Sequence, residues 1–155
     1  NAQSKYKVAL PTEAQWEKAA RGIDGQIYPW KTNQKPDKTL CNFGGNEGGT
    51  TAVGKYSPQG DSPYECADMA GNVWEWCDTF YRKDMNSVRA REQFAGFEED
   101  GGGSKYRVLR GGSWDRVTPL FLESACRNND VPEGRGDFLG FRCVLEPASP
   151  PEGRK

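Results

Sequence analysis

One stretch of this sequence decides the fold: residues 107–144, RVLRGGSWDRVTPLFLESACRNNDVPEGRGDFLGFRCV. A frame made of RVLRGGSW, Arg127, Pro132, Arg135 and LGFRCV encloses short runs that follow no repeating pattern. The apolar residues of the frame predict two core strands, at 107–110 and 141–145. The runs between them mix acidic, basic, amide and aromatic side chains, which is typical of a functional loop surface. The stretch therefore belongs either to a catalytic pocket or to a binding surface.

The composition around this stretch predicts one loop-rich domain. With 155 residues, the chain is long enough for a single core. Its apolar fraction of 35% and its mean hydropathy of −0.87 make it polar for a globular protein. Five Trp, six Tyr and seven Phe supply large packing units, and 19 Gly and 10 Pro indicate many turns. We expect tryptophan-centred packing to hold the loops.

Charge and hydropathy argue against two kinds of partner. The 21 basic and 22 acidic residues give a net charge of −1, and the basic residues are scattered. Nucleic-acid binding needs a basic face instead. No apolar run approaches the roughly 20 residues of a membrane-spanning helix. We therefore expect neither nucleic-acid binding nor membrane insertion.

Cysteine and histidine usage narrows the chemistry. The chain has no His, and its five cysteines form no CxxC pair, so the usual zinc ligands and spacings are missing. Without His, Ser-His and Cys-His nucleophile pairs are impossible within the chain. An odd number of cysteines leaves at least one free thiol, and buried free cysteines are the expected state.

Local signals predict one helix and several short strands. Residues 11–22 form the clearest helix, with Thr12 as N-cap, with Trp16, Ala19 and Ala20 on one face, and with Gly22 as the stop. Strands are expected at 6–10, at 53–56 and at the end of 68–76, between glycine-rich loops. An exposed insertion is expected at 84–105. The tail PASPPEGRK, 147–155, is predicted to be flexible, which leaves a domain at 1–146.

Six motifs then occur in order along nearly the whole chain. They resemble the formylglycine-generating-enzyme (sulfatase-modifying factor) branch of the C-type lectin fold. The resemblance implies an α+β, C-type lectin-like fold that is loop-rich, with short strands and few helices. The family carries a further N-terminal part before the first motif, so we expect a fragment or a reduced version. The motifs are LPTEAQWEKAARG (10–22), YPW (28–30), NFGGNEGGTTAVGKY (42–56), DMAGNVWEW (68–76), RVLRGGSW (107–114) and LGFRCV (139–144).

Catalytic members of that branch place two cysteines after the GGS-aromatic motif, where they bind copper(I) and activate oxygen to oxidise a substrate cysteine. The matching positions here are Arg116 and Phe121, and neither supplies the thiolate that copper(I) prefers. Cys126 lies beyond the second position. The resemblance therefore implies no copper, no catalytic residue and no enzyme activity. A copper oxidase of this type, or a non-catalytic relative of one, is the alternative, and an accessory domain of a larger protein is another.

The frame at 107–144 also resembles the variable proteins of diversity-generating retroelements, which are C-type lectin-fold proteins of phages, viruses, bacteria and archaea. A reverse transcriptase mutates adenines of a copied template, so residues on one exposed C-terminal surface vary and bind ligands. This resemblance implies a ligand-binding display protein whose variable region spans about 115–138. Its ligand would be a protein or glycan on a host or target cell, and its location a virion or cell surface.

The frame leaves sixteen positions open for such variation. In that setting aromatic and Arg side chains act as anchors, and Asn and Asp act as adaptable polar contacts. An ordinary loop surface without a dedicated ligand is the alternative. The open positions are Asp115, Arg116, Val117, Thr118, Leu120, Phe121, Cys126, Asn128, Asn129, Asp130, Val131, Glu133, Gly134, Gly136, Asp137 and Phe138.

The resemblance to the catalytic branch also implies two sets of structural calcium ligands. Side-chain oxygens and loop carbonyls suit a hard cation. The alternative is that the carboxylates in these loops only make turn and strand hydrogen bonds. One set is Asp68, the Gly71 carbonyl, the Val73 carbonyl and Glu75; the other is Asn42, the Phe43 carbonyl, Asn46 and the Gly48 carbonyl.

Overall fold

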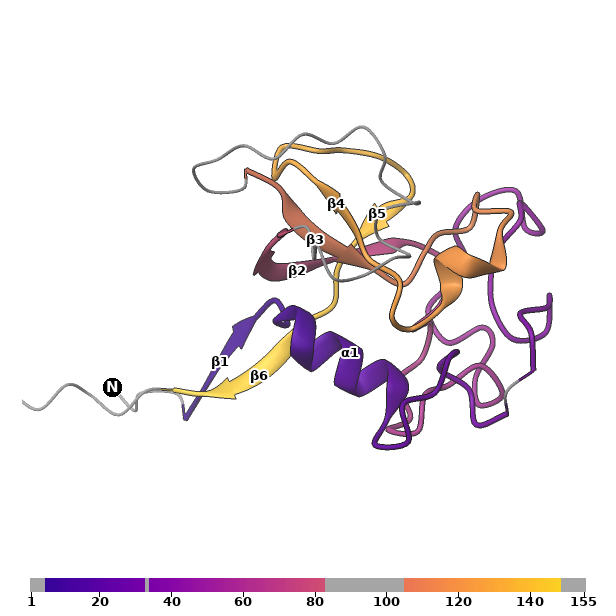
Figure 1. Ribbon diagram of the computed structural model, residues 1–155, viewed down its shortest axis with the longest axis horizontal. Helices are drawn as coiled ribbons and strands as arrows, with labels where there is room; N and C mark the ends of the chain where they lie inside the picture. The colour runs from indigo at the N-terminus through magenta and orange to yellow at the C-terminus, as the bar shows by residue number, and fades with distance from the viewer. Residues whose placement is uncertain (1–4, 33, 83–104, 149–155) are drawn as a thin grey trace, which may run out of the picture.

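The computed structural model describes residues 5–32, 34–82 and 105–148 of the chain. Loops dominate these ranges, and the regular elements are short, as the α+β, loop-rich prediction requires (Figure 1). None of the described helices is long and apolar enough to cross a membrane. The elements, in order, are β1 (Tyr6–Ala9), α1 (Glu13–Arg21), β2 (Trp74–Phe80), β3 (Arg107–Arg110), the 3-10 helix η1 (Pro119–Leu122), β4 (Asn128–Asp130), β5 (Leu139–Gly140) and β6 (Val144–Pro147).

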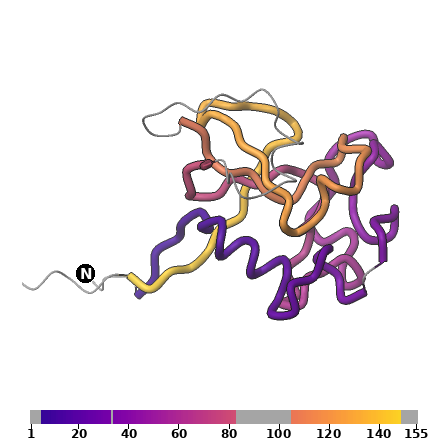
Figure 2. The backbone as a smooth tube through the Cα atoms, viewed as in Figure 1, coloured from indigo at the N-terminus to yellow at the C-terminus, as the bar shows by residue number. Residues whose placement is uncertain are grey.

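The strands form two sheets. The larger has the order β4-β3-β2-β5, in which β2 and β3 are antiparallel, β3 and β4 are antiparallel, and β2 and β5 are parallel. The smaller is an antiparallel ribbon of β1 and β6, which brings the two ends of the described chain together (Figure 2). Helix α1 lies beside the larger sheet, and the long loops gather at the far end of that helix (Figure 1).

Helix α1 begins and ends where the sequence predicts. The Thr12 side chain accepts a hydrogen bond from the Gln15 backbone, while Gln15 accepts one from the Thr12 backbone, which makes a capping box. Gly22 ends the helix at a φ of 65°, a left-handed conformation that favours glycine. Trp16 and Ala20 are buried against the sheet, so the predicted apolar face is confirmed.

A buried guanidinium joins this helix to the sheet. Arg110 on β3 is fully buried, and its two terminal nitrogens donate to Glu13 (2.9 Å) and Glu17 (2.8 Å) of α1. The same side chain donates to the Ser124 carbonyl (2.7 Å), and Arg127 donates to Glu13 (2.8 Å). Burial alone would raise the pKa of Glu17, but the neighbouring guanidiniums of Arg21 and Arg110 hold it below its ordinary value. Helix, sheet and the loop after η1 are therefore fixed through one cluster of charges.

Several strand predictions need correction. Residues 53–56 form turns rather than a strand, because no neighbouring strand pairs with them and Gly54 adopts a φ of 78°. Of the strand expected at 141–145, only 144–145 are in a strand (β6); residues 141–143 link β5 to β6, and Phe141 is exposed. Strand β2 continues past Trp76 to Phe80.

The predicted tail also begins too early. Pro147 pairs with Tyr6, and the Ala148 N–H donates to the Lys5 carbonyl (2.9 Å), so both belong to the ribbon. Residues 149–155 lie outside the described ranges, as does nearly all of the insertion expected at 84–105.

Replacing Arg110 by Met should lower the urea concentration at which the protein unfolds. The change removes the buried cation that joins Glu13 and Glu17 to β3 and leaves the Ser124 carbonyl without its donor, although Glu13 keeps Arg127 and Glu17 keeps Arg21. We therefore expect a loss of about 3 kcal/mol, at the lower end of the cost of breaking a buried ion pair. Urea unfolding followed by tryptophan fluorescence measures this loss. Arg107→Met is the matched control, since Arg107 pairs with the exposed Asp78 and should cost no more than about 1 kcal/mol. Equal losses in the two variants would contradict the role assigned to Arg110.

Candidate functional site

The open positions of the frame lie in one segment of the chain, residues 115–138, which is called the 115–138 face below. It comprises the turn after β3, helix η1, strand β4 and the loop that leads into β5. In Figure 1 these segments lie in the orange to yellow part of the chain, along and beyond the outer strand of the larger sheet.

The backbone at the start of this face is held by a glycine loop distant in sequence. The Gly45 N–H donates to the Trp114 carbonyl (2.8 Å), and the Gly44 N–H donates to the Arg116 carbonyl (2.9 Å). Both glycines have positive φ, and a Cβ added to either would meet nothing within 4 Å. Conformation, rather than space, therefore requires glycine at these two positions.

The far end of the face is held in the same way. The Trp74 N–H on β2 donates to the Phe138 carbonyl (2.8 Å), and the Trp114 indole donates to the Asp137 carbonyl (3.4 Å). Peptide groups and framework tryptophans thus fix both ends of the 115–138 face. Between these ends, the Asn128 and Asp130 side chains accept from the backbone N–H groups of Asn129 (2.9 Å) and Val131 (2.7 Å), so side chains also contribute to the backbone path there.

An arginine held by aromatic rings lies at the centre of the face. The Arg116 guanidinium carbon is 5.8 Å from the Phe121 ring centroid and 5.9 Å from that of Phe138. Phe121 in turn meets Trp74 edge to face, with 6.2 Å between centroids. Cation–π contacts of this kind pre-orient a charge that is still partly exposed. Arg116 and Phe121 occupy the positions matched to the catalytic cysteines, so a guanidinium and a phenyl ring stand there instead of thiols.

Exposure differs among the open positions. Val117 and Leu120 are 75% and 52% exposed. Asp115, Glu133, Gly136 and Asp137 are also exposed, and nine others are half-buried. Cys126 is the exception, because it is buried and packs with Trp74 and Leu109.

Two open positions are coupled to their neighbours. A Cβ on Gly134 would lie 2.5 Å from the Asp130 carboxylate, and one on Gly136 would lie 2.7 Å from the Phe138 ring. A side chain at either glycine needs its neighbour to move. Exchange at these sites is therefore expected to occur in pairs, which sequence spacing alone did not reveal.

The first predicted calcium set already has partners. Glu75 is buried; it accepts from the Trp16 indole (2.6 Å) and from two nitrogens of Arg142 (2.5 and 2.7 Å). Burial lowers the pKa of Arg142, but the ion pair with Glu75 outweighs it and raises that pKa. Asp68 accepts from the Gly54 N–H (2.7 Å). As placed, these carboxylates do not fit a cation, and the geometry favours the alternative of turn and strand hydrogen bonds.

The second calcium set is also incomplete. The Asn42 amide nitrogen donates to the Gly49 carbonyl (2.8 Å), and the Phe43 carbonyl accepts from the Asn46 N–H (3.2 Å). The buried Asn42 Oδ1 has no partner and is the one orphaned oxygen among the side chains of this set. Within the described ranges, no three His, Cys, Asp or Glu side chains gather as a metal site would require. Calcium at either set stays a prediction.

The sequence matches the family of the sulfatase-modifying factor enzyme 1-like domain over residues 1–147. It is 38% identical over 136 residues to the serine/threonine-protein kinase pkn1 of Chlamydia caviae, covering 87% of this chain and 20% of that protein. It is 33% identical over 156 residues to the inactive C-alpha-formylglycine-generating enzyme 2 of Bos taurus, a match that covers 92% of this chain and 45% of that protein. It is 39% identical over 141 residues to the hercynine oxygenase of Mycobacterium tuberculosis, a match that covers 88% of this chain and 32% of that protein.

Among solved structures, the chain is similar to Treponema denticola variable protein 1, with a TM-score of 0.66 and 31% identity. The match covers 88% of this chain and 46% of that one. The α+β C-type lectin-like fold implied by the motifs is confirmed. The relatives include enzymes and an inactive member, and the chain spans less than half the length of each protein compared.

Chelation should leave the melting temperature unchanged. Because Arg142 already neutralises Glu75, removing divalent ions takes away nothing that holds the Asp68 loop. Thermal unfolding in excess EDTA and in excess calcium measures this. A clear fall in EDTA that calcium restores would show that a cation holds one of the two sets.

Native alkylation should separate the thiols by burial. Burial raises the pKa of Cys41 and of Cys77 to about 12, so almost no thiolate forms at mildly alkaline pH. Cys143 is exposed and should react with iodoacetamide first, whereas Cys41, Cys77 and Cys126 should react only after unfolding. Mass spectrometry of peptides gives the order. Early labelling of Cys126 would mean that it is accessible on the 115–138 face after all.

Proposed function

Because the chain belongs to the sulfatase-modifying factor enzyme 1-like domain family, we propose that it is a non-enzymatic member that displays a ligand-binding surface at 115–138. One observation carries this proposal: backbone hydrogen bonds from the glycine loop and from Trp74 hold both ends of the surface, while six of its sixteen open positions are exposed and nine are half-buried. Such a surface can change its side chains without losing its shape.

The surface is that of a retroelement-diversified variable protein. Similarity to Treponema denticola variable protein 1 at 31% identity supports this assignment. The ligand is a protein or glycan on a host or target cell, and the chain works from a virion or cell surface. A reverse transcriptase gene beside this one, with a near copy of the last segment rich in adenine at the open positions, is the genomic signature to look for.

Arg116 and Phe121 argue against oxidase chemistry, because neither side chain is a thiol. Copper(I) requires soft thiolate ligands. Arg116 and Phe121 supply a cation and a hydrocarbon ring there, and Cys126 is buried behind them. No other described residue on the face offers a thiol.

The charge of the face favours a basic target. Four open positions (Asp115, Asp130, Glu133 and Asp137) carry carboxylates, whereas Arg116 alone carries a cation. Charge complementarity steers association and lowers affinity for like-charged surfaces. A protein with a basic patch therefore fits this version of the face better than a neutral glycan does.

A second candidate function is an accessory domain of a larger protein. The 38% identity to a Chlamydia caviae kinase, of which the chain covers 20%, favours it. The two functions are compatible, because an accessory domain can also present a binding face.

A library randomised at the exposed positions tests the proposal. Codons for Asp115, Val117, Leu120, Glu133 and Asp137 are randomised together in a cell-surface display format, and the folded fraction is measured with a conformation-sensitive reagent. We expect most variants to fold, because the backbone bonds of this face do not involve these side chains. Panning the library against lysozyme, a folded basic protein, should then yield binders that differ at these positions.

A matched library at framework positions is the control. Randomising Trp74, Leu109, Arg110, Trp114 and Arg127 should leave few folded variants, since these side chains carry the core and the ion cluster. Equal folded fractions in the two libraries would remove the basis of the display proposal. Copper-dependent oxidation of a cysteine peptide by the purified protein would instead restore the oxidase alternative.

A further inference from the structure

One face of the β1–β6 ribbon is apolar and exposed. The register places Tyr6 opposite Pro147 and Val8 opposite Leu145, so these four side chains lie on the same face. Tyr6 is 56% exposed, Val8 is 67% exposed and Leu145 is 70% exposed. Antiparallel sheets normally turn their apolar face to the core and their polar face to water. In this ribbon the arrangement is reversed.

The opposite face of the ribbon is charged and lies against α1. Lys7 and Glu146 are paired across the two strands, with 3.0 Å between the Lys7 Nζ and the Glu146 Oε2. The Gln15 amide of α1 donates to the same carboxylate (3.4 Å). The helix therefore contacts the charged face, and the described part of the chain leaves the apolar face uncovered.

The apolar face continues into residues 141–143, which link β5 to β6. Arg142 turns inward and donates to Glu75 (2.7 Å), whereas its neighbours Phe141 and Cys143 are exposed. Exposed and half-buried residues alternate in the same way from 141 to 147. The exposed set, called the apolar stripe below, comprises Tyr6, Val8, Phe141, Cys143, Leu145 and Pro147.

The apolar stripe is large for a surface without a partner. Its six side chains expose on the order of 600 Å², which is the upper end for the largest apolar patch of a monomer. Two such stripes in contact would bury roughly 1,200 Å², the lower bound for specific protein–protein interfaces. The area therefore suffices for a dimer.

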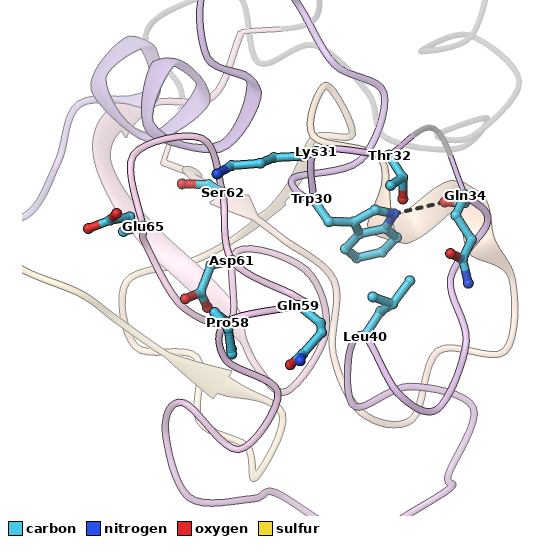
Figure 3. A pocket seen from close by; sticks show the side chains of 10 residues that line it. All are labelled: Trp30, Lys31, Thr32, Gln34, Leu40, Pro58, Gln59, Asp61, Ser62 and Glu65. Carbon is cyan, nitrogen blue, oxygen red and sulfur yellow. Dashed lines mark hydrogen bonds between the residues drawn. The ribbon is translucent and has the colours of Figure 1, made fainter.

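The hollow beside Trp30, drawn in Figure 3, offers a partner less apolar surface. Trp30 and Ser62 are each 1% exposed, so neither side chain is open to contact. The exposed residues around this hollow include Lys31, Gln59 and Glu65, which are polar. Outside the 115–138 face, the apolar stripe is the stronger candidate for an interaction surface.

The chemistry of the apolar stripe suits a second copy of the same chain. In a two-fold interface the same patch lies on both subunits, so a charge near the axis meets a charge of its own sign. None of the six residues of the stripe is acidic or basic. Lys7 and Glu146, on the opposite face of the ribbon, already neutralise each other. A strongly charged partner would find no counter-charge on the stripe.

We propose that two copies of this chain associate through the apolar stripe, with ribbon face against ribbon face about a two-fold axis. Each copy removes the apolar side chains of the other from water, which is the main driving force of association. In Figure 1 the ribbon lies at the end of the molecule opposite η1. The η1 end of the 115–138 face therefore stays open in the dimer.

Sedimentation equilibrium of the full chain measures this association. The 17.2-kDa chain should dimerise with a dissociation constant on the order of 10 μM, as expected near the lower size bound of interfaces. Val8→Lys with Leu145→Glu should weaken the dimer at least about 100-fold, because it replaces apolar contacts by charges. The two new charges lie directly opposite each other and can pair across the strands, which preserves the ribbon.

Ile23→Lys with Val53→Glu is the matched control. Ile23 is 80% exposed and Val53 is 83% exposed, and both lie outside the apolar stripe. This control should dimerise like the unmodified chain. Urea unfolding of both double variants checks that each one is folded.

Alkylation of Cys143 tests the contact without any variant. In dilute protein Cys143 reacts freely with iodoacetamide. At about tenfold above the dissociation constant, the second copy should cover it and slow the reaction about fivefold, by mass action. Cys66 is half-buried and lies outside the apolar stripe, so its rate should not change with protein concentration and serves as the reference.

Three results would overturn the proposal. They are a chain that stays monomeric at every concentration, equal association of the stripe variant and its control, and a Cys143 rate that does not depend on concentration. A monomer would assign the apolar stripe to a different protein, and the other two results would place the dimer contact elsewhere. The display libraries report on the 115–138 face in a monomer and in a dimer alike, so the two proposals fail separately.

Discussion

The buried guanidinium of Arg110 is the interaction on which the rest of the structure depends. Arg110 lies on strand β3, and its side chain bonds to helix α1 and to the loop after η1. A buried cation is stable only when its charge and its N–H groups are matched, and Glu13 and Glu17 match them. Because α1 has one turn between these glutamates, the helix can dock on the sheet in only one register.

A second buried ion pair, between Arg142 and Glu75, holds the C-terminal segment to the larger sheet. Arg142 bonds to Glu75 on β2, and the Trp16 indole bonds to the same carboxylate. Helix, central strand and C-terminal segment therefore meet at one acidic side chain. Arg142 lies in the link between β5 and β6, where no strand forms. Polar contacts across long sequence separations do here what a larger apolar core does in other domains.

Elements whose signals lie close together in the sequence could be predicted, and elements that depend on distant contacts could not. Helix α1 could be predicted because its cap, its apolar face and its stop lie within ten residues of one another. The turn at 53–56 could not, because strand formation depends on a pairing partner that residue order does not reveal. At the site, the frame positions were readable, but the burial of Cys126 was not, since it depends on Trp74 and Leu109 from two other strands.

If the 115–138 face binds a ligand as we propose, stability and recognition are divided between different atoms on it. Stability comes from peptide groups, which every residue supplies, and from Trp74 and Trp114, which lie in the frame. Recognition is left to side chains such as Val117 and Leu120, which contribute little to the core. The division is incomplete at Phe121 and Phe138, which both touch Arg116 and pack on the cluster around Trp74. Diversity at these two positions therefore acts on stability as well as on binding, and the centre of the face has less freedom to vary than its rim.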